Sequence, residues 1–134
     1  SSKGDTVLVD FKSYRPSYDA PASFMASPIF KGTKKVGVVI FQMPLETVNR
    51  IMGERVGMGE TGESYLVGRD LLMRSDSFLD AKSHSVVASF KHPEKGAVGT
   101  EAVKSVFSGE TATRIITDYN GNPVVSMGNL IGAG

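Results

Sequence analysis

Residues 57–77 read GMGETGESYLVGRDLLMRSDS and place a glycine-rich corner directly before two short runs that are typical of strands. Glycine reaches positive φ at little cost, so we expect a sharp turn here, with positive φ at Gly59 or Gly62. A preceding helix must therefore end at this corner. Residues 64–67 and 71–77 then predict an antiparallel hairpin with Gly-Arg-Asp as its tight connection.

The segment before the corner contains three runs rich in β-branched and apolar residues, 6–11, 23–30 and 35–43. The Lys-Gly-Thr-Lys sequence at 31–34 predicts the turn of a hairpin between the second and third runs. Residues 36–41 are apolar on both faces, which is the pattern of a central, covered strand.

A helix is predicted between these strands and the glycine corner. Pro44 suits its first turn, while Glu46 near its start and Arg50 and Arg55 near its end suit the helix dipole. Its apolar positions recur at helical spacing, namely at Leu45, Val48, Ile51, Met52 and Val56. We therefore expect an amphipathic helix that connects two sheets.

Residues 78–99 have weaker periodicity and are interpreted as a loop, with a short strand at 85–90. Thr100 and Gly109 then bracket residues 102–107 as a short capped helix.

The C-terminal part of the sequence predicts a second hairpin. Two strands are expected at 111–119 and 123–130. The Asn-Gly-Asn sequence between them is a strong hairpin signal.

Composition excludes several classes of function. The 134 residues carry a formal net charge of +1, which provides no field to attract nucleic acid or an anionic membrane. Cysteine is absent, so thiolate chemistry and disulfides are excluded. No apolar run reaches the length of a membrane-spanning helix. We therefore expect any membrane anchors of a parent protein to lie outside this chain.

The run GETGESYLVG followed by LMRSDS closely resembles the hairpin of bacterial extracytoplasmic Cache sensor domains. These are the PAS-like ligand-binding parts of chemoreceptors, sensor histidine kinases and cyclases. Segments 101–103, 107–111 and 118–126 resemble the later part of a membrane-proximal Cache module. Those at 10–18, 22–30 and 36–43 resemble the last strands of a membrane-distal module.

The resemblance implies an α+β fold of PAS-like antiparallel sheet modules linked by the central amphipathic helix, a partial double-Cache arrangement. Distal strands would occupy 1–43, the connecting helix 44–58 and the proximal module 59–134. The expected function is a periplasmic or extracellular sensor of an inner-membrane receptor, in chemotaxis or two-component signalling. A non-binding structural spacer or a dimerisation module, compatible with a homodimer, is the alternative.

The resemblance also implies a first candidate ligand site. The segment Arg-Pro-Ser-Tyr at 15–18 resembles the Arg-x-Trp-Tyr segment by which amino-acid-sensing double-Cache domains clamp a carboxylate. Ser17 replaces the Trp, and Gln42 stands where an aspartate accepts the ligand's amine, so a carboxylate of two to four carbons is favoured over an amino acid. The predicted ligand-binding residues are Tyr14, Arg15, Ser17, Tyr18, Phe24 and Gln42. Alternatively, Arg15 caps a loop or pairs with Asp10 or Asp19 at the surface.

A second candidate site lies after the glycine corner, at Tyr65, Arg74, Asp76 and Tyr119. Strand alternation places Arg74 and Asp76 on one face, so they either bind an anion with a tyrosine hydroxyl or form an ion pair that braces the loop. Both interpretations predict a partly buried Arg74.

The remaining reactive residues point to no enzyme and no cofactor. His84 and His92 stand eight positions apart in a polar segment, so surface histidines are favoured over a metal site. No serine has a base at a recognised spacing, and no catalytic residue is assigned. The glycine spacing at residues 57–62 matches the Gly-x-Gly-x-x-Gly motif of dinucleotide-binding folds. The predicted structural context does not match, because the motif here follows a helix rather than a strand.

Overall fold

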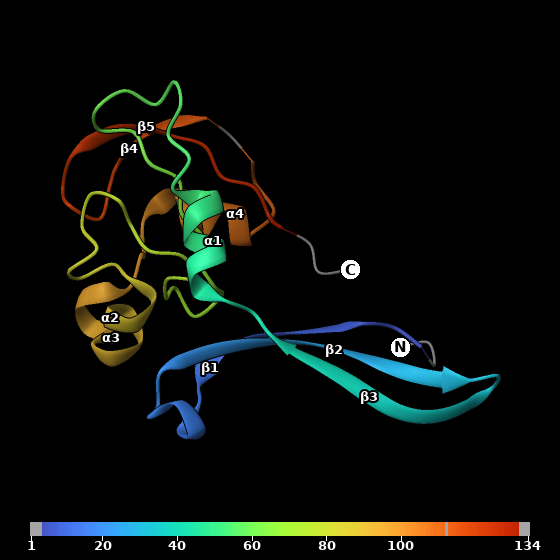
Figure 1. Ribbon diagram of the computed structural model, residues 1–134. Coiled ribbons are helices and arrows are strands. Elements are labelled where there is room, and N and C mark those ends of the chain that lie inside the picture. Colours follow the sequence, from blue (N-terminus) through green and yellow to red (C-terminus); the bar gives the residue numbers. More distant parts are fainter. Residues whose placement is uncertain (1–3, 112, 132–134) are drawn as a thin grey trace. The chain divides into compact units, whose positions relative to one another are not determined.

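The computed structural model describes residues 4–111 and 113–131. It has a mixed α+β architecture, with two antiparallel sheets and several short helices (Figure 1). The chain divides into two compact units, unit 1 (Ser1–Ile51) and unit 2 (Met52–Gly134). The mixed α+β class expected from the sequence is confirmed.

Unit 1 is built on a three-stranded antiparallel sheet in the order β1-β2-β3. The three strands confirm the three predicted runs, and their bounds are β1 Val7–Ser13, β2 Pro21–Lys31 and β3 Lys34–Gln42. A two-residue turn at Gly32 and Thr33 joins β2 to β3, with Lys31 paired to Lys34. Between β1 and β2 lies a 3₁₀ turn, η1 (Arg15–Ser17), which begins with proline in its first turn.

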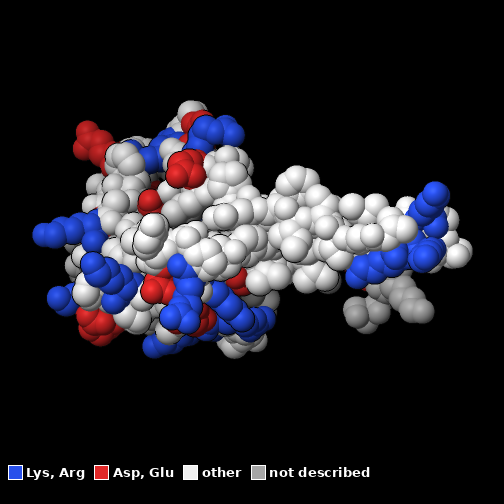
Figure 2. Space-filling model, turned by 60° about the horizontal axis from the view of Figure 1, so that its bottom comes forward, with Lys and Arg blue, Asp and Glu red and all other residues white. Residues whose placement is uncertain are grey.

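The expectation that β3 is a central, covered strand is wrong. It lies at the edge of the sheet, and Ile40 and Phe41, which point to opposite faces, are 63% and 62% exposed. The apolar pattern fits burial on both faces, but the described residues of unit 1 provide no layer that covers them. In Figure 2 the part of unit 1 at the right is nearly free of charge except for basic side chains towards its far end.

Helix α1 (Leu45–Met52) leads from unit 1 into unit 2 and is shorter than predicted. It ends four residues before Val56 because Gly53 follows, and glycine is a poor helix residue. Glu46 lies in its first turn and Arg50 in its last, as the helix dipole favours. None of its residues is buried.

The described part of unit 2 contains three short helices and a two-stranded sheet. These elements are α2 Val86–Lys91, α3 Pro93–Gly96, α4 Glu101–Phe107, β4 Arg114–Thr117 and β5 Pro123–Ser126. Helix α4 with its Thr100 cap and the β4–β5 hairpin confirm the prediction, although both strands are shorter than expected. Ala112, in the first of the predicted strands, lies outside the described residues.

The prediction of a loop with a strand at 85–90 is wrong. Ser85 caps α2 by accepting a hydrogen bond from the Ala88 N–H, and Pro93 begins α3. The run Val-Val-Ala-Ser-Phe is so short that its apolar pattern is compatible with a strand and with a buried helix. Periodicity alone therefore does not distinguish the two structures. The cap and the proline favour the helix.

The predicted hairpin after the glycine corner exists only as a single antiparallel bridge between Val67 and Met73. It is supplemented by a hydrogen bond from the Arg74 N–H to the Leu66 carbonyl, 2.7 Å. Leu71 in its connection has a φ of 66°. The expected positive φ in the glycine corner is confirmed at Gly59, where φ is 68°.

The buried apolar side chains of unit 2 come from several elements rather than from one sheet. They are Met73, Val86, Val98 and Ile116. Around this small core lie buried polar side chains, including Arg74, Ser77 and His84, which all make hydrogen bonds. Buried polar groups need such hydrogen-bond partners, so these polar contacts stabilise the fold of unit 2 together with its apolar core.

Candidate functional site

The first candidate site surrounds the turn between β1 and β2. The Tyr18 N–H donates to the Arg15 carbonyl at 3.0 Å, which closes η1. The Tyr14 ring meets Phe24 edge to face at 5.0 Å between ring centroids, and Phe24 pairs across the sheet with Gln42. The fold therefore brings Tyr14, Phe24 and Gln42 together at one end of the sheet.

The cation of this site faces solvent. Arg15 is exposed and makes no ion pair with another described residue, so the surface pair with Asp10 or Asp19 is not formed. Ser17 is half-buried in the turn. Tyr18 is 99% exposed with a φ of 54°, and its ring forms no wall beside Arg15.

Arg74 of the second candidate site is buried, with 8% exposed, as both interpretations predicted. Its Nη2 lies 2.9 Å from Asp70 Oδ2, and its Nη1 donates to the Leu72 carbonyl at 3.1 Å. The guanidinium also lies over the Phe90 ring at 5.1 Å. A side chain at Gly68 would overlap the guanidinium, so glycine there makes room for it. These contacts brace the bridge between Val67 and Met73.

Asp76 contacts the start of helix α2 in the same unit. Its Oδ1 accepts a hydrogen bond from the Val86 N–H at 2.8 Å, at the start of α2. The carboxylate thereby stabilises the first turn of this helix. Its place in the sequence gave no indication of this partner.

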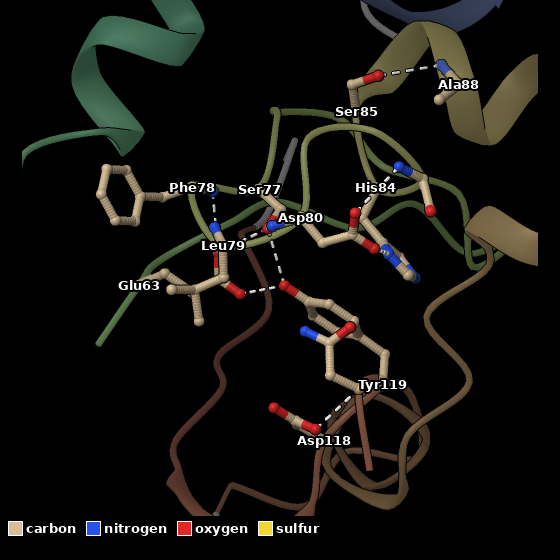
Figure 3. A network of polar contacts seen from close by, with 12 residues as sticks. Glu63, Ser77, Phe78, Leu79, Asp80, His84, Ser85, Ala88, Asp118 and Tyr119 are labelled. Carbon is tan, nitrogen blue, oxygen red and sulfur yellow. Dashed lines mark hydrogen bonds and ion pairs between the residues drawn. The ribbon is translucent and has the colours of Figure 1, made fainter. Parts of the chain in front are cut away.

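A polar network centred on Glu63 joins three segments of unit 2 (Figure 3). Glu63 Oε2 accepts hydrogen bonds from Ser77 Oγ at 2.8 Å, the Phe78 N–H at 2.9 Å and the Leu79 N–H at 3.2 Å. Its Oε1 accepts a hydrogen bond from the Tyr119 hydroxyl. Glu63 is thus the residue that ties the glycine corner to the rest of the unit, and sequence reasoning missed it.

Two tyrosines next to this carboxylate resist ionisation. Burial, followed by the charges of Glu63 and Asp118, raises the pKa of Tyr65 to about 12. Burial and the hydrogen bond to Glu63 also raise the pKa of Tyr119. Their rings meet edge to face at 5.6 Å between centroids. Both hydroxyls therefore stay neutral at physiological pH.

His84 is buried, with 5% exposed, so the prediction of a surface histidine is wrong for this residue. Its Nδ1 lies 2.8 Å from Asp80 Oδ2, and its ring lies against Tyr119 at 4.1 Å between centroids. Burial by itself raises the pKa of the Asp80 carboxyl, but hydrogen bonds from His84 and Ser83 outweigh it and hold the pKa below its usual value. The spacing of Asp80 and His84, four residues apart, is the sequence signal for this pair.

His84 is one of the residues that line an open hollow of about 460 Å³ in unit 2. The residues around this hollow are His84, Lys95, Ala97, Gly99, Thr100, Glu101, Thr117, Asp118 and Tyr119. Of the four residues of the second candidate site, only Tyr119 lines it, while Tyr65 contacts Tyr119 from another side. His92, in contrast, is exposed as predicted.

Unit 1 has a hollow of its own, of about 570 Å³, beside the hairpin between β2 and β3. Its lining includes Pro28, Phe30, Lys35 and Val38 but no residue of the first candidate site. Within 4–111 and 113–131, no three His, Cys, Asp or Glu side chains form a group that could hold a metal ion. In the same residues no helix has the length and apolarity needed to cross a membrane.

No protein-family model, curated protein or solved structure was found to match this chain.

Proposed function

We propose that the chain is a periplasmic or extracellular sensor domain that binds a small organic ligand and relays its presence to a transmembrane signalling protein. The motif resemblance to Cache domains, with their PAS-like double-module fold, supports this function. A small carboxylate is the favoured ligand. The observation that carries the proposal is the exposed side chain of Arg15, a cation without an ion pair among the described residues, which directly follows Tyr14 of the Tyr14–Phe24 ring pair.

The proposed mechanism is a shift between receptor states rather than a chemical reaction. A carboxylate bound by Arg15 would draw the η1 turn towards the end of the sheet where Phe24 pairs with Gln42. A ligand that binds one conformation more tightly than another shifts the population towards that conformation. Helix α1 follows β3 directly in the chain and is the element through which a change in unit 1 would pass towards unit 2.

A thermal-shift panel of amino acids and two- to four-carbon organic acids tests the proposal. At least one compound should stabilise the folded chain by about 2.7 kcal/mol at a hundredfold excess over its dissociation constant. Arg15→Ala should weaken that binding about tenfold or more, because a charge-assisted contact is lost. Arg50→Ala, which removes an exposed arginine of α1, is the matched control and should bind normally.

Arg74→Ala separates the two candidate sites. Because Arg74 is buried and paired with Asp70, its loss should lower the melting temperature without preventing binding. If Arg74→Ala abolishes binding in a folded chain while Arg15→Ala has no effect, the ligand site belongs to unit 2.

The alternative function is a structural spacer or dimerisation module without a ligand. The exposed apolar side chains on both faces of the unit 1 sheet favour it, since exposed apolar patches commonly mark association surfaces. Sedimentation of the wild type and of Ile40→Lys tests association through this sheet. Association that Ile40→Lys abolishes, together with a panel in which no compound raises the melting temperature, would favour the alternative over the sensor.

A further inference from the structure

His84 combines deep burial with an unused nitrogen. Its Nδ1 is bonded to Asp80, and its Nε2 has no hydrogen-bond partner among the described residues. Every fully buried side-chain nitrogen or oxygen in the described part of the chain has a partner. Nε2 is therefore not fully buried, and His84 is one of the residues that line the open hollow of unit 2.

The bond to Asp80 determines what Nε2 offers to a ligand. The low pKa of the Asp80 carboxyl keeps it ionised at neutral pH, so it accepts a hydrogen bond and the Nδ1 carries the proton. In the neutral ring Nε2 is then an acceptor. A ligand that contacts this nitrogen must bring a donor, either a hydroxyl or an ammonium group.

Lys95, which also lines the hollow, carries a positive charge that suits a carboxylate on the ligand. Its ammonium has no ion pair among the described residues, whereas Glu101 lies 3.9 Å from Arg114. Asp118 Oδ1 already accepts hydrogen bonds from the N–H groups of Asn120 and Asn122, at 2.9 and 2.7 Å. The positive charge of Lys95 is thus the one in this lining that a carboxylate of a ligand would neutralise.

The remaining wall of the hollow is aromatic. The Tyr119 hydroxyl is held by Glu63 and Ser77, so this residue presents its ring rather than a free hydroxyl. Thr100 lines the hollow too, with its hydroxyl oxygen accepting from the Val103 N–H as the cap of α4. About 460 Å³ falls within the size range of small-molecule sites.

We propose that the hollow of unit 2 is a second ligand site, which binds a small carboxylate that carries a hydroxyl or ammonium donor on the neighbouring carbon. Lys95 pairs with the carboxylate, His84 Nε2 accepts from the neighbouring donor, and the Tyr119 ring packs against the carbon skeleton. The inference rests on the proposed sensing function and deepens it by naming a site and a ligand class in unit 2.

Four three-carbon probes test this chemistry on the full chain: lactate, alanine, propionate and lactamide. Lactate and alanine carry both groups, propionate lacks the donor and lactamide lacks the carboxylate. NMR of the imidazole protons reports the site directly, with His92→Gln assigning the two histidines. The His84 resonance should shift saturably as lactate or alanine is added. The same shift with propionate or lactamide should require concentrations about tenfold higher or more. The His92 resonance should not respond.

Two matched lysine variants complete the test. Lys95→Met should weaken binding of the responding probe about tenfold, because the charge-assisted contact is lost. Lys91→Met removes an exposed charge from α2 outside the lining and should leave binding unchanged. Propionate binding as tightly as lactate, or a His84 resonance that no probe shifts, would overturn the proposal. Binding that Arg15→Ala weakens and Lys95→Met does not would also overturn it, while leaving the sensing function of unit 1 intact.

Discussion

A single carboxylate, that of Glu63, holds together segments that lie far apart in the sequence. It accepts hydrogen bonds from residues 77–79 and from Tyr119, which lies two residues after the end of β4. Arg55 fixes the same corner from the other side, with Nη2 donating to the Glu60 carbonyl at 2.7 Å and the guanidinium 3.6 Å from the centre of the Phe78 ring. The glycine corner is therefore anchored by charged side chains rather than by regular secondary structure.

Backbone conformation at this corner gives the prediction for a single residue. Gly59 has a φ of 68° with open space where a Cβ would lie, so Gly59→Ala tests backbone strain without a steric clash. It should lower the free energy of unfolding by about 1 to 2 kcal/mol. Gly99 has no positive φ and only ordinary contacts around a Cβ, so Gly99→Ala should stabilise by about 0.4 to 1 kcal/mol. Denaturant unfolding compares the two variants, and a shift in the same direction for both would contradict the argument.

At the scale of elements, the strands of unit 1 and helix α4 of unit 2 were predictable, whereas helices α2 and α3 were not. Long runs of apolar and β-branched residues separated by a Lys-Gly-Thr-Lys turn leave little choice of structure for β2 and β3. The sequence of the six residues of α2 is compatible with either a strand or a helix, because an apolar run this short shows no clear periodicity. The Ser85 cap and Pro93 favour the helix locally, and the burial of Val86 and Ser89, which depends on the fold of the whole unit, adds to this preference.

The cap of α2 provides the test at this scale. Ser85 Oγ accepts from the Ala88 N–H at 3.1 Å, so Ser85→Ala should destabilise the chain by about 1 kcal/mol. Ser85→Asp keeps an acceptor and adds a favourable charge at the helix start, so it should retain most of the wild-type stability. Thermal unfolding of the three proteins measures this. Equal losses in both variants would mean that Ser85 acts through packing rather than as a cap.

At the scale of the whole molecule, the two units differ in what stabilises them. Unit 2 buries Met73, Val86 and Val98 completely, whereas the sheet of unit 1 keeps most of its large apolar side chains exposed. Unit 2 also contains a polar network in which burial favours neutral tyrosines, while hydrogen bonds favour an ionised Asp80. The free energy of unfolding should therefore depend on pH both in the acidic range and in the alkaline range.

The alkaline side gives the clearer prediction. Because the pKa of Tyr65 is about 12 in the folded chain and about 10 when unfolded, its stabilising effect is complete below pH 10 and declines as pH rises towards 12. Urea unfolding below and within this window should show the free energy of unfolding falling with pH. Tyr65→Phe should reduce the slope, and the exposed Tyr14→Phe should not. An unchanged slope in Tyr65→Phe would show that this hydroxyl does not carry the effect.

The acidic side has the opposite sign. The Asp80 carboxyl has a lowered pKa in the folded chain, so its contribution is present above the unfolded value of about 3.9 and is lost as pH falls through the folded value. This loss also removes the acceptor that orients the His84 ring.

The candidate sites were predictable to unequal extents. Residues close in sequence, such as Tyr14 and Arg15, lie together because the chain itself keeps them together. The hollow of unit 2 draws His84, Lys95 and Tyr119 from three segments, and no local pattern reveals that convergence. The burial of His84 follows from its position against Tyr119, a contact 35 residues away in the chain that only the folded unit creates.

Strand β3 of unit 1 has no buried face that distinguishes one pairing register with β2 from the next. In a sheet with one buried face, a slip of one residue would expose every apolar side chain, and this penalty fixes the pairing. In β3, both faces carry exposed apolar side chains, so a register shift of one residue would replace one apolar face with a similar one. The register between β2 and β3 is determined instead by the two-residue turn at Gly32 and Thr33 and by the shift in register between Ile29 and Phe30. One residue inserted beside Gly32 would therefore leave several registers close in free energy.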